Sequence, residues 1–221
     1  METATLPPEL LARAERLLAA GGRRVLGIAG APGGGKSTLA AALGAALGSR
    51  AAVVPMDGFH LAQCELERLG RASRKGAPDT FDAAGFVSLL RRLRGQGSDE
   101  VVYAPSFRRE IEEPVAGAIA VEPSVPLVIT EGNYLLLDTH GFAPVRALLD
   151  ESWFVAPAEA DRLRWLLARH MAFGRTEEAA RRWIEATDAP NARLILESAP
   201  RADLVVGSSS GASRPEPATI A

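Results

Sequence analysis

The segment Gly30-Ala-Pro-Gly-Gly-Gly-Lys36-Ser37 has the spacing G-x-x-x-x-G-K-[ST] that is typical of a phosphate-binding loop. The residues before it, 24–29, form a short apolar run of strand length, and residues 37–47 have the composition and spacing of a helix. A strand, a glycine-rich loop and a helix, in this order, are the context that the motif requires. The segment therefore predicts an α/β fold that binds a phosphate group at the start of the helix.

The residues of the loop suit the binding of a nucleotide. Lys36 and Lys75 are the only lysines beside 23 arginines, and an ammonium on a flexible stem can follow a phosphate group as a point charge. Glycine amides can crowd around phosphate oxygens because no Cβ atom blocks them. The Ser37 hydroxyl is placed to ligate Mg²⁺. The expected nucleotide-binding residues are Gly30, Gly33, Gly34, Gly35, Lys36, Ser37 and Thr38.

The bulk properties exclude several classes of protein. The 221 residues carry a formal net charge of −2 with basic and acidic residues well mixed, which argues against a nucleic-acid-binding surface. A single cysteine, Cys64, excludes an internal disulfide. No apolar run approaches the roughly 18 residues of a membrane span, and no signal peptide pattern is present, so we expect a cytoplasmic protein without a membrane partner. The sequence leaves a homodimer open.

Strand-like apolar runs alternate with helical stretches along the chain, and such alternation predicts a parallel sheet covered by helices. The runs are 25–29, 51–56, 100–104, 116–121, 126–130, 152–155 and 203–206; the helical stretches are 39–47, 83–94, 144–150, 159–173 and 176–186. The five runs that begin at Val25, Ala51, Pro126, Ser152 and Asp203 are the expected sheet. We therefore predict a three-layer α/β sandwich of the P-loop NTPase type with a five-stranded, mostly parallel sheet, in one domain over residues 1–206. Residues 207–221 are expected to form a disordered tail.

Two acids follow strands of this sheet. Asp57 comes after the run 51–56, and Glu131 after the run 126–130. Ligands of such sheets bind beyond the carboxyl ends of the strands. Asp57 can accept a hydroxyl proton there, and Glu131 suits the outer shell of Mg²⁺. Taken alone, either acid could be a helix cap or a solvated turn residue.

From Val25 to about Val206 the chain resembles the P-loop kinases that include phosphoribulokinase, uridine kinase and bacterial pantothenate kinase. Besides the loop, the resemblance rests on Met56-Asp-Gly-Phe-His60, on Lys75-Gly-Ala-Pro-Asp-Thr-Phe-Asp82 and on Glu131-Gly-Asn-Tyr-Leu-Leu136. Within this group the chain looks most like a branch of nucleoside/nucleotide kinase-like proteins, some of which are called fructose kinases. The resemblance implies transfer of the γ-phosphate of ATP, with Asp57 as general base and with catalytic help from Lys36.

The resemblance also implies an acceptor pocket, for which we expect His60, Lys75, Asp79, Arg109 and Tyr134 to bind substrate. The chain departs from the best-known members. Gly76 stands where uridine kinases carry an aspartate for the ribose hydroxyls, and residues 103–114 contain no histidine. Arg108 replaces an aspartate that usually precedes the arginine at 109 in the similar branch. Arg74 and Lys75 favour an anionic or polyhydroxylated acceptor.

In kinases of this group, a helical lid, expected here over residues 158–186, carries arginines that close on the phosphates. By that resemblance Arg169 is the expected catalytic arginine and Arg162 a nucleotide-binding one, whereas ordinary solvation of a surface helix is the alternative. Asn191 is either a nucleotide contact or a helix cap. His170 falls near an apolar stripe and is expected to pack rather than to react.

The sequence thus predicts an ATP- and Mg²⁺-dependent kinase that phosphorylates a hydroxyl of a small metabolite, such as fructose, another sugar or a pantothenate-like acceptor. The alternatives are a nucleoside kinase of the uridine type and an ATP-binding or ATPase module without an acceptor. A GTPase switch would carry an Asn-Lys-x-Asp motif, and the positions of the two lysines exclude one.

Overall fold

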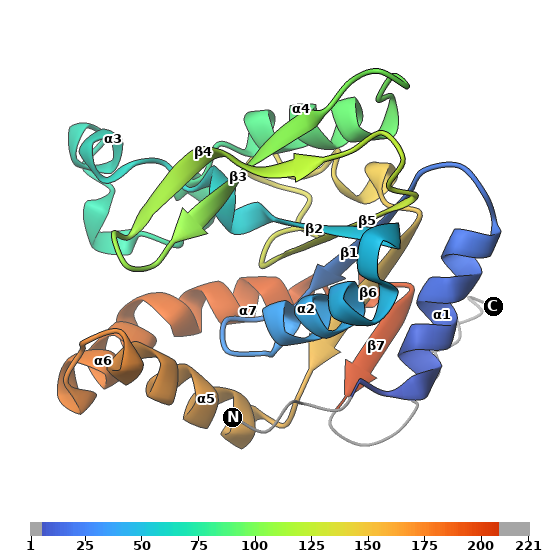
Figure 1. The fold of residues 1–221 in the computed structure, drawn as a ribbon. Helices are drawn as coiled ribbons and strands as arrows, with labels where there is room; N and C mark the ends of the chain where they lie inside the picture. The colour runs from blue at the N-terminus through green and yellow to red at the C-terminus, as the bar shows by residue number, and fades with distance from the viewer. Residues whose placement is uncertain (1–5, 208–221) are drawn as a thin grey trace, which may run out of the picture.

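A sheet of five parallel strands forms the centre of the computed structural model, which describes residues 6–207 (Figure 1). In spatial order the strands are β2 (Ala51–Pro55), β5 (Leu127–Gly132), β1 (Arg24–Ala29), β6 (Glu151–Ala156) and β7 (Leu204–Gly207). The five predicted sheet strands are therefore confirmed, and every neighbouring pair is parallel. Residues 208–221 of the predicted tail lie outside the described part of the chain, and the single-domain boundary at 206 stays a prediction.

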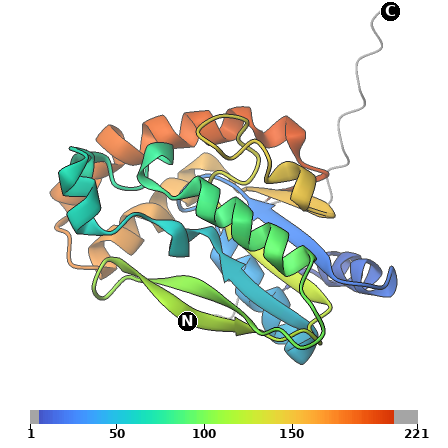
Figure 2. The same ribbon diagram turned by 90° about the horizontal axis from the view of Figure 1, so that it is seen from above.

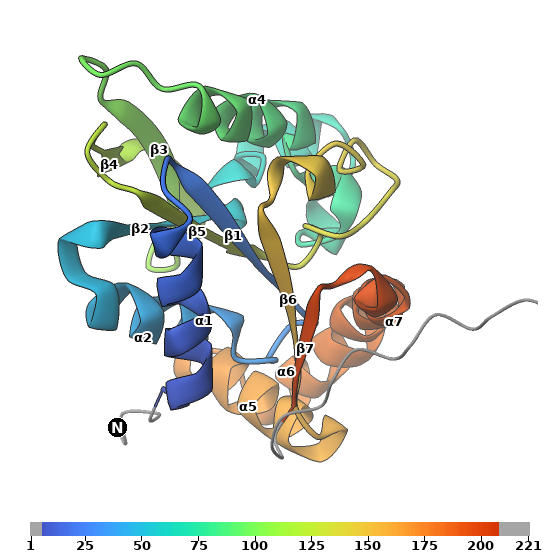
Figure 3. The same cartoon turned by 90° about the vertical axis from the view of Figure 1, so that its right-hand side faces the viewer.

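Helices cover both faces of the sheet, and the alternation of side chains along each strand supplies the two cores. Leu26 and Ile28 of β1 point to the face covered by α1 (Pro8–Ala19) and α2 (Lys36–Leu47). Val25 and Ala29 point to the opposite face, which α4 (Ala83–Arg94) and α7 (Ala189–Glu197) cover (Figures 2 and 3). The result is the predicted three-layer sandwich.

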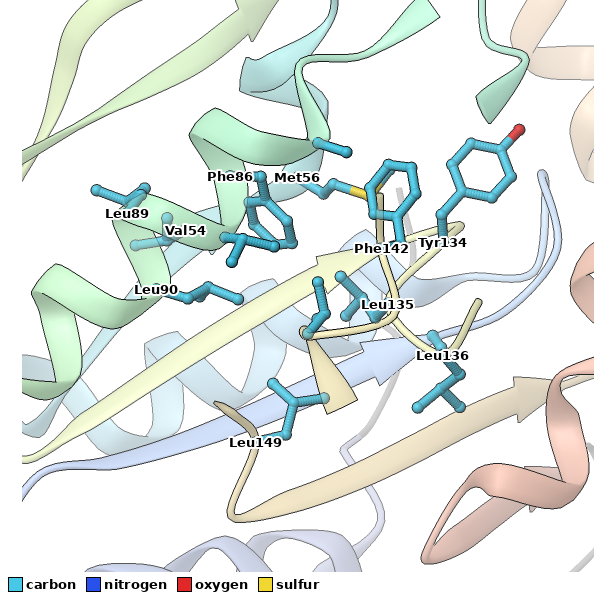
Figure 4. Close-up of a cluster of buried hydrophobic side chains, with 14 of the residues drawn as sticks. Val54, Met56, Phe86, Leu89, Leu90, Tyr134, Leu135, Leu136, Phe142 and Leu149 are labelled. Carbon is cyan, nitrogen blue, oxygen red and sulfur yellow. The ribbon is translucent and has the colours of Figure 1, made fainter. Parts of the chain in front are cut away.

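A cluster of aromatic and aliphatic side chains fills the core beneath α4 (Figure 4). The Tyr134 ring lies 5.5 Å from both the Phe81 and the Phe142 ring centroids, and Phe59 meets Phe86 edge to face at 5.4 Å. Phe59 belongs to segment 56–60 and Phe81 to segment 75–82, and the sequence assigns residues of both segments to the acceptor pocket. The core therefore anchors these segments to the sheet.

The two remaining predicted strands form a separate antiparallel hairpin, β3 (Val102–Arg108) and β4 (Glu113–Val121). The hairpin packs over the 3₁₀ turn Met56–Phe59 that follows β2 (Figure 1). Its approach is so close that a Cβ atom on Gly58 would lie 2.3 Å from the carbonyl oxygen of Pro105. Only glycine therefore fits next to Asp57 at this point.

The helices predicted over 159–173 and 176–186 form as α5 (Glu159–Ala172) and α6 (Glu177–Trp183), followed by a π-helical turn, Ile184–Asp188, that leads into α7. We call α5 and α6 the lid, and their closing over the phosphates stays a prediction. A short helix, α3 (Gln63–Arg68), was not predicted. The other short 3₁₀ helices are Gly48–Arg50, Ala72–Arg74, Pro78–Thr80, Arg146–Leu148 and Ala199–Arg201. Among the described residues, no helix has the length and apolar character needed to cross a bilayer.

The helix predicted over 144–150 is wrong, because only the 3₁₀ turn Arg146–Leu148 forms there. The backbone N–H of Asp150 donates to the carbonyl of Val25 at 2.8 Å, and the Asp150 carboxylate accepts from the Val25 N–H at 2.8 Å. These bonds fix the end of the segment to the start of β1, and a helix could not satisfy them.

Asp150 also accepts hydrogen bonds from Arg24 at 3.0 Å and from Arg94 at 2.7 Å. Burial alone would raise the pKa of this carboxyl, but the bonds from Val25, Arg94 and Arg24 outweigh it and lower the pKa below its usual value. A carboxylate with a lowered pKa stabilises the fold above the pKa of the unfolded chain, about 3.9, and that stability is lost as the pH falls through the folded value.

We expect Asp150→Asn to lower the free energy of unfolding by about 1–2 kcal/mol at pH 7, since charge-assisted bonds are lost. The difference from wild type should shrink as the pH falls below about 4. Urea unfolding at several pH values measures both quantities, with the exposed Asp99→Asn as the matched control. A difference that stays constant down to pH 3 would contradict this explanation.

Candidate active site

The phosphate-binding loop is held in shape by glycine conformations and by the lid. Gly33 and Gly35 have φ angles of 79° and 89°, which favour glycine. A Cβ atom on Gly33 would lie 2.7 Å from the carbonyl oxygen of Arg162 and 2.8 Å from the Cβ of Leu166. Helix α5 therefore packs directly against the loop, and the first amides of α2 stay unpaired within the helix and face the loop.

Lys36, the first residue of α2, is buried, with 8% of its surface exposed. Its Nζ donates to the carbonyl of Ala31 at 3.1 Å. Burial lowers the pKa of Lys36 to about 8, although the carboxylates of Glu131 and Asp57 oppose the shift. The carboxylates of the chain thus do not fully offset the burial of the ammonium. A bound phosphate group would raise the pKa of Lys36 again and favour its charged form.

Ser37 and Glu131 meet where a metal ion is expected. The Ser37 hydroxyl donates to Oε1 of Glu131 at 2.9 Å. Burial, reinforced by the charge of Asp57, raises the pKa of Glu131 above its ordinary value, and Lys36 and Ser37 oppose that rise. Within residues 6–207, no three His, Cys, Asp or Glu side chains could hold a metal by themselves. A hydroxyl and one carboxylate fit Mg²⁺, which keeps several waters and takes phosphate oxygens as ligands.

Asp57 forms an ion pair with Arg109, whose Nη2 lies 3.3 Å from Oδ2. The Arg109 guanidinium lies over two rings, 5.7 Å from the centroid of Phe107 on β3 and 5.9 Å from that of Phe173, the residue after α5. Arg109 therefore connects the hairpin, the lid and the predicted base.

Two cavities meet at these residues. The smaller, about 270 Å³, is lined by the loop glycines, Thr38 and Trp165. The larger, about 410 Å³, is lined by Asp57, Glu131 and the acceptor-side residues. Four side chains line both, and they are Lys36, Ser37, Arg109 and Arg169. The loop and the predicted base thus open into adjoining spaces with three cations at the boundary.

Two predicted acceptor residues line the larger cavity in addition to Arg109. His60 Nδ1 lies 2.8 Å from the backbone oxygen of Asp57, and because a carbonyl only accepts, Nδ1 must carry the hydrogen. Burial lowers the pKa of His60, so the ring is neutral near pH 7. Lys75 Nζ donates to the carbonyl of Glu112 at 2.5 Å and lies 5.5 Å from the centroid of Phe107.

The structure does not bring Asp79 and Tyr134 into either cavity lining. Asp79 pairs with Arg74 at 2.6 Å and with Arg71 at 3.4 Å on the outer side of its segment. Tyr134 is fully buried, and its hydroxyl donates to the carbonyl of Gly76 at 2.5 Å. Tyr134 therefore holds the backbone of the acceptor segment from beneath.

Two predicted nucleotide contacts also lie elsewhere. Arg162 is buried, and it donates to the carbonyl of Pro32 at 2.8 Å and to Glu159 at 2.6 and 2.7 Å. It supports the loop from the lid side and lines neither cavity. Asn191 lies inside α7 and not at its cap, and its Nδ2 is 3.4 Å from the carbonyl of Gly76. Arg169, in contrast, reaches both cavities.

Sequence reasoning missed several cavity residues, among them Trp165, Phe107, Phe173 and Trp183. Helical spacing could have found Trp165, because positions 162, 165 and 169 share one face of α5. Phe107 and Phe173 gave no such signal. His170, expected to pack, pairs through Nε2 with Asp188 at 2.8 Å, and this pair connects α5 to the π-helical turn before α7 at the cavity wall.

The parallel sheet and the glycine-rich loop after β1 define a fold of the P-loop type, and comparison with known proteins gives the family. A family model described as "Phosphoribulokinase / Uridine kinase family" matches residues 25–212. A candidate uridine kinase of Schizosaccharomyces pombe is 37% identical over 210 residues, which cover 90% of this chain and 88% of that protein. A pantothenate kinase of Leifsonia xyli is 32% identical over 158 residues, covering 68% of this chain and 48% of that protein.

A solved structure gives the same result. The crystal structure of a candidate fructose transport system kinase from Silicibacter superposes with a TM-score of 0.79 at 39% identity, covering 88% of this chain and 98% of that chain. The protein belongs to the phosphoribulokinase/uridine kinase family. The predicted family and fold class are therefore confirmed, and the family generally implies ATP with Mg²⁺ and a small-molecule acceptor.

The lowered pKa of Lys36 predicts that the lysine takes up a proton when a polyphosphate binds. Above pH 8 the lysine is mostly neutral in the free protein, and a nearby polyanion raises its pKa again. At pH 9 we expect uptake of a large fraction of one proton per nucleotide bound. Titration calorimetry in buffers of different ionisation enthalpy measures the uptake.

Lys36→Arg is the matched control, since arginine keeps the charge but does not titrate in this range. The variant should bind nucleotide at pH 9 with uptake near zero. Equal uptake in the two proteins would assign the proton to another group and refute the prediction.

Proposed function

We propose that the protein is an ATP-dependent kinase that transfers the γ-phosphate to a hydroxyl of a small metabolite, with Asp57 as general base. The observation that carries the proposal is the shared boundary of the two cavities. Lys36, Ser37, Arg109 and Arg169 face both the loop side and the side that holds Asp57. A phosphoryl group at this boundary could be reached by the loop from one side and by an acceptor hydroxyl from the other.

Each residue has a chemical part in this reaction. The loop amides and Lys36 bind the phosphates, and Arg169 adds positive charge as the transferred group develops negative charge. Ser37 and Glu131 would hold Mg²⁺, which neutralises phosphate charge when it is bound. Asp57 takes the hydroxyl proton; the acceptor oxygen then forms its bond to Pγ as the bond from Pγ to the β-phosphate oxygen breaks, which releases ADP.

The Asp57–Arg109 ion pair suggests how the base is kept ready. Arg109 compensates the carboxylate while no hydroxyl is in place, and it lies at the boundary that the transferred group would occupy. A guanidinium that turns from Asp57 toward the phosphoryl group would free the carboxylate to accept a proton. Arg109 would then act in both halves of the site.

For the acceptor we propose a sugar such as fructose or a pantothenate-like compound. The names of the relatives point to sugars, pantothenate and uridine. A nucleoside acceptor is the second candidate, but Gly76 lines the cavity without a side chain that could bind ribose hydroxyls. An ATPase without an acceptor is disfavoured by the size of the larger cavity, about 410 Å³ beside the loop.

We expect Asp57→Asn to lower kcat by about 10²- to 10⁴-fold while the Kd for ATP changes only a few-fold, because the amide cannot accept the proton. Acceptor-dependent ADP release measures kcat, with pantothenate, nucleosides, fructose, glycerate and phosphorylated pentoses as the panel. The exposed Asp99→Asn is the control for general effects of the amide. A kcat for Asp57→Asn within three-fold of wild type would remove Asp57 from the base role.

A further inference from the structure

The acceptor side of the larger cavity contains two cations that the phosphate chemistry does not use. Lys75 and Arg175 line this cavity and are absent from the lining of the smaller one. Lys75 comes from the acceptor segment, and Arg175 from the loop between α5 and α6 of the lid. An acceptor in the larger cavity would therefore lie between a cation of the protein body and a cation of the lid.

The carboxylates of the cavity do not neutralise these two cations. Asp57 pairs with Arg109, Asp188 with His170, and Glu131 accepts from Ser37. Among residues 6–207, no carboxylate oxygen lies within 4.0 Å of the charged nitrogens of Lys75 or Arg175. The one other acid in the lining, Glu112, is exposed and is thus a single negative charge facing two positive ones.

Both cations are held in place by neutral groups. The Lys75 ammonium is fixed by the Glu112 carbonyl and by the Phe107 ring, which leaves two of its three hydrogens for a ligand. Glu112 adopts a φ angle of 54°, rare for a residue other than glycine, at the tip of the hairpin that supplies this carbonyl. The Arg175 guanidinium lies 4.2 Å from the Trp183 ring centroid, so the ring orients it by stacking.

The position of Lys75 relative to the base suits a small acceptor. The Lys75 ammonium lies 5.5 Å from the centroid of the Phe107 ring, and the Arg109 guanidinium that pairs with Asp57 lies 5.7 Å from the same centroid, so the two cations are close to one ring. A molecule of a few carbon atoms could therefore reach Asp57 with a hydroxyl at one end and Lys75 with a charged group at the other. A hydroxyl of a neutral polyol could also accept from the ammonium, but only an anionic group would compensate its charge as well.

We propose that the acceptor is a small hydroxy compound that carries a carboxylate or phosphate group, and that Lys75 and Arg175 bind this group. The proposal rests on the proposed kinase function and narrows its substrate class. It favours a hydroxy acid, a pantothenate-like acid or a sugar phosphate over free fructose and over nucleosides.

The first test uses matched acceptors that differ in one charged group. The pairs are glycerate and glycerol, pantothenate and pantothenyl alcohol, and fructose 6-phosphate and fructose. For at least one pair we expect the anionic compound to support ADP release with a kcat/KM at least about 10-fold above that of its neutral partner. The first two pairs report on a carboxylate and the third on a phosphate group. Preferred turnover of a neutral member would overturn the anion site while leaving the kinase function intact.

The second test asks whether Lys75 is responsible. Lys75→Gln should raise the KM for the preferred anionic acceptor by about 10- to 100-fold with a kcat and a KM for ATP near wild type, and Lys75→Arg should restore part of the loss. Arg74→Gln is the matched control, because it removes the same charge from the adjacent residue, which pairs with Asp79 and lines neither cavity. Equal effects of Lys75→Gln and Arg74→Gln would overturn the assignment.

A binding measurement separates this proposal from the kinase function. With the loop filled by a non-hydrolysable ATP analogue and Mg²⁺, inorganic phosphate should raise the Tm of the full-length protein, and Lys75→Gln should lose that rise while Arg74→Gln keeps it. A Tm unaffected by phosphate in wild type, or equally raised in Lys75→Gln, would overturn the anion site. A Lys75-dependent rise without ADP release from any acceptor would keep the anion site and reject the kinase.

Discussion

The register of the parallel ladder is the constraint on which the site depends. Glu131 of β5 lies between β1 and β2, opposite Ile28 on one side and Pro55 on the other. Ile28 comes two residues before the loop, and Pro55 two residues before Asp57. The loop, the metal-side carboxylate and the predicted base therefore leave the sheet at one edge. A slip of one residue in β5 would turn Glu131 to the other face and separate it from Ser37.

This constraint explains how much of the site the sequence could predict. Asp57 follows β2, Glu131 is the second-last residue of β5, and Lys36 follows the loop after β1. Strand ends can be found from apolar runs and placed at one edge by the fold class. The remaining side chains depend on packing between distant segments. Nothing in the spacing shows that Arg162 turns to the carbonyl of Pro32, or that Tyr134 points beneath Gly76. The helix predicted over 144–150 failed for the same reason, since a bond between Asp150 and Val25 joins residues 125 positions apart.

The charges of the site form a nearly compensated set that a phosphate group completes. Burial disfavours the charged forms of both Lys36 and Glu131, as the lowered pKa of the lysine and the raised pKa of the acid show. Each partly relieves the other, and Ser37 ties the acid to the loop. A buried ammonium next to orphan amides of a helix start is costly without an anion and favourable with one. The cost of burying the Lys36 ammonium and the affinity for phosphate therefore have one origin.

The two halves of the site come from different parts of the fold. The phosphate half is built on β1, β5 and the start of α2, where ladder bonds fix every position. The acceptor half is built on the hairpin tip, the segment around Lys75 and the lid loop, which the sheet does not constrain. Phe107 joins the halves, since its ring contacts Lys75, Arg109 and His60. Changes at the hairpin tip and at the loop that carries Arg175 can thus alter acceptor recognition without moving the ladder that positions the phosphate half.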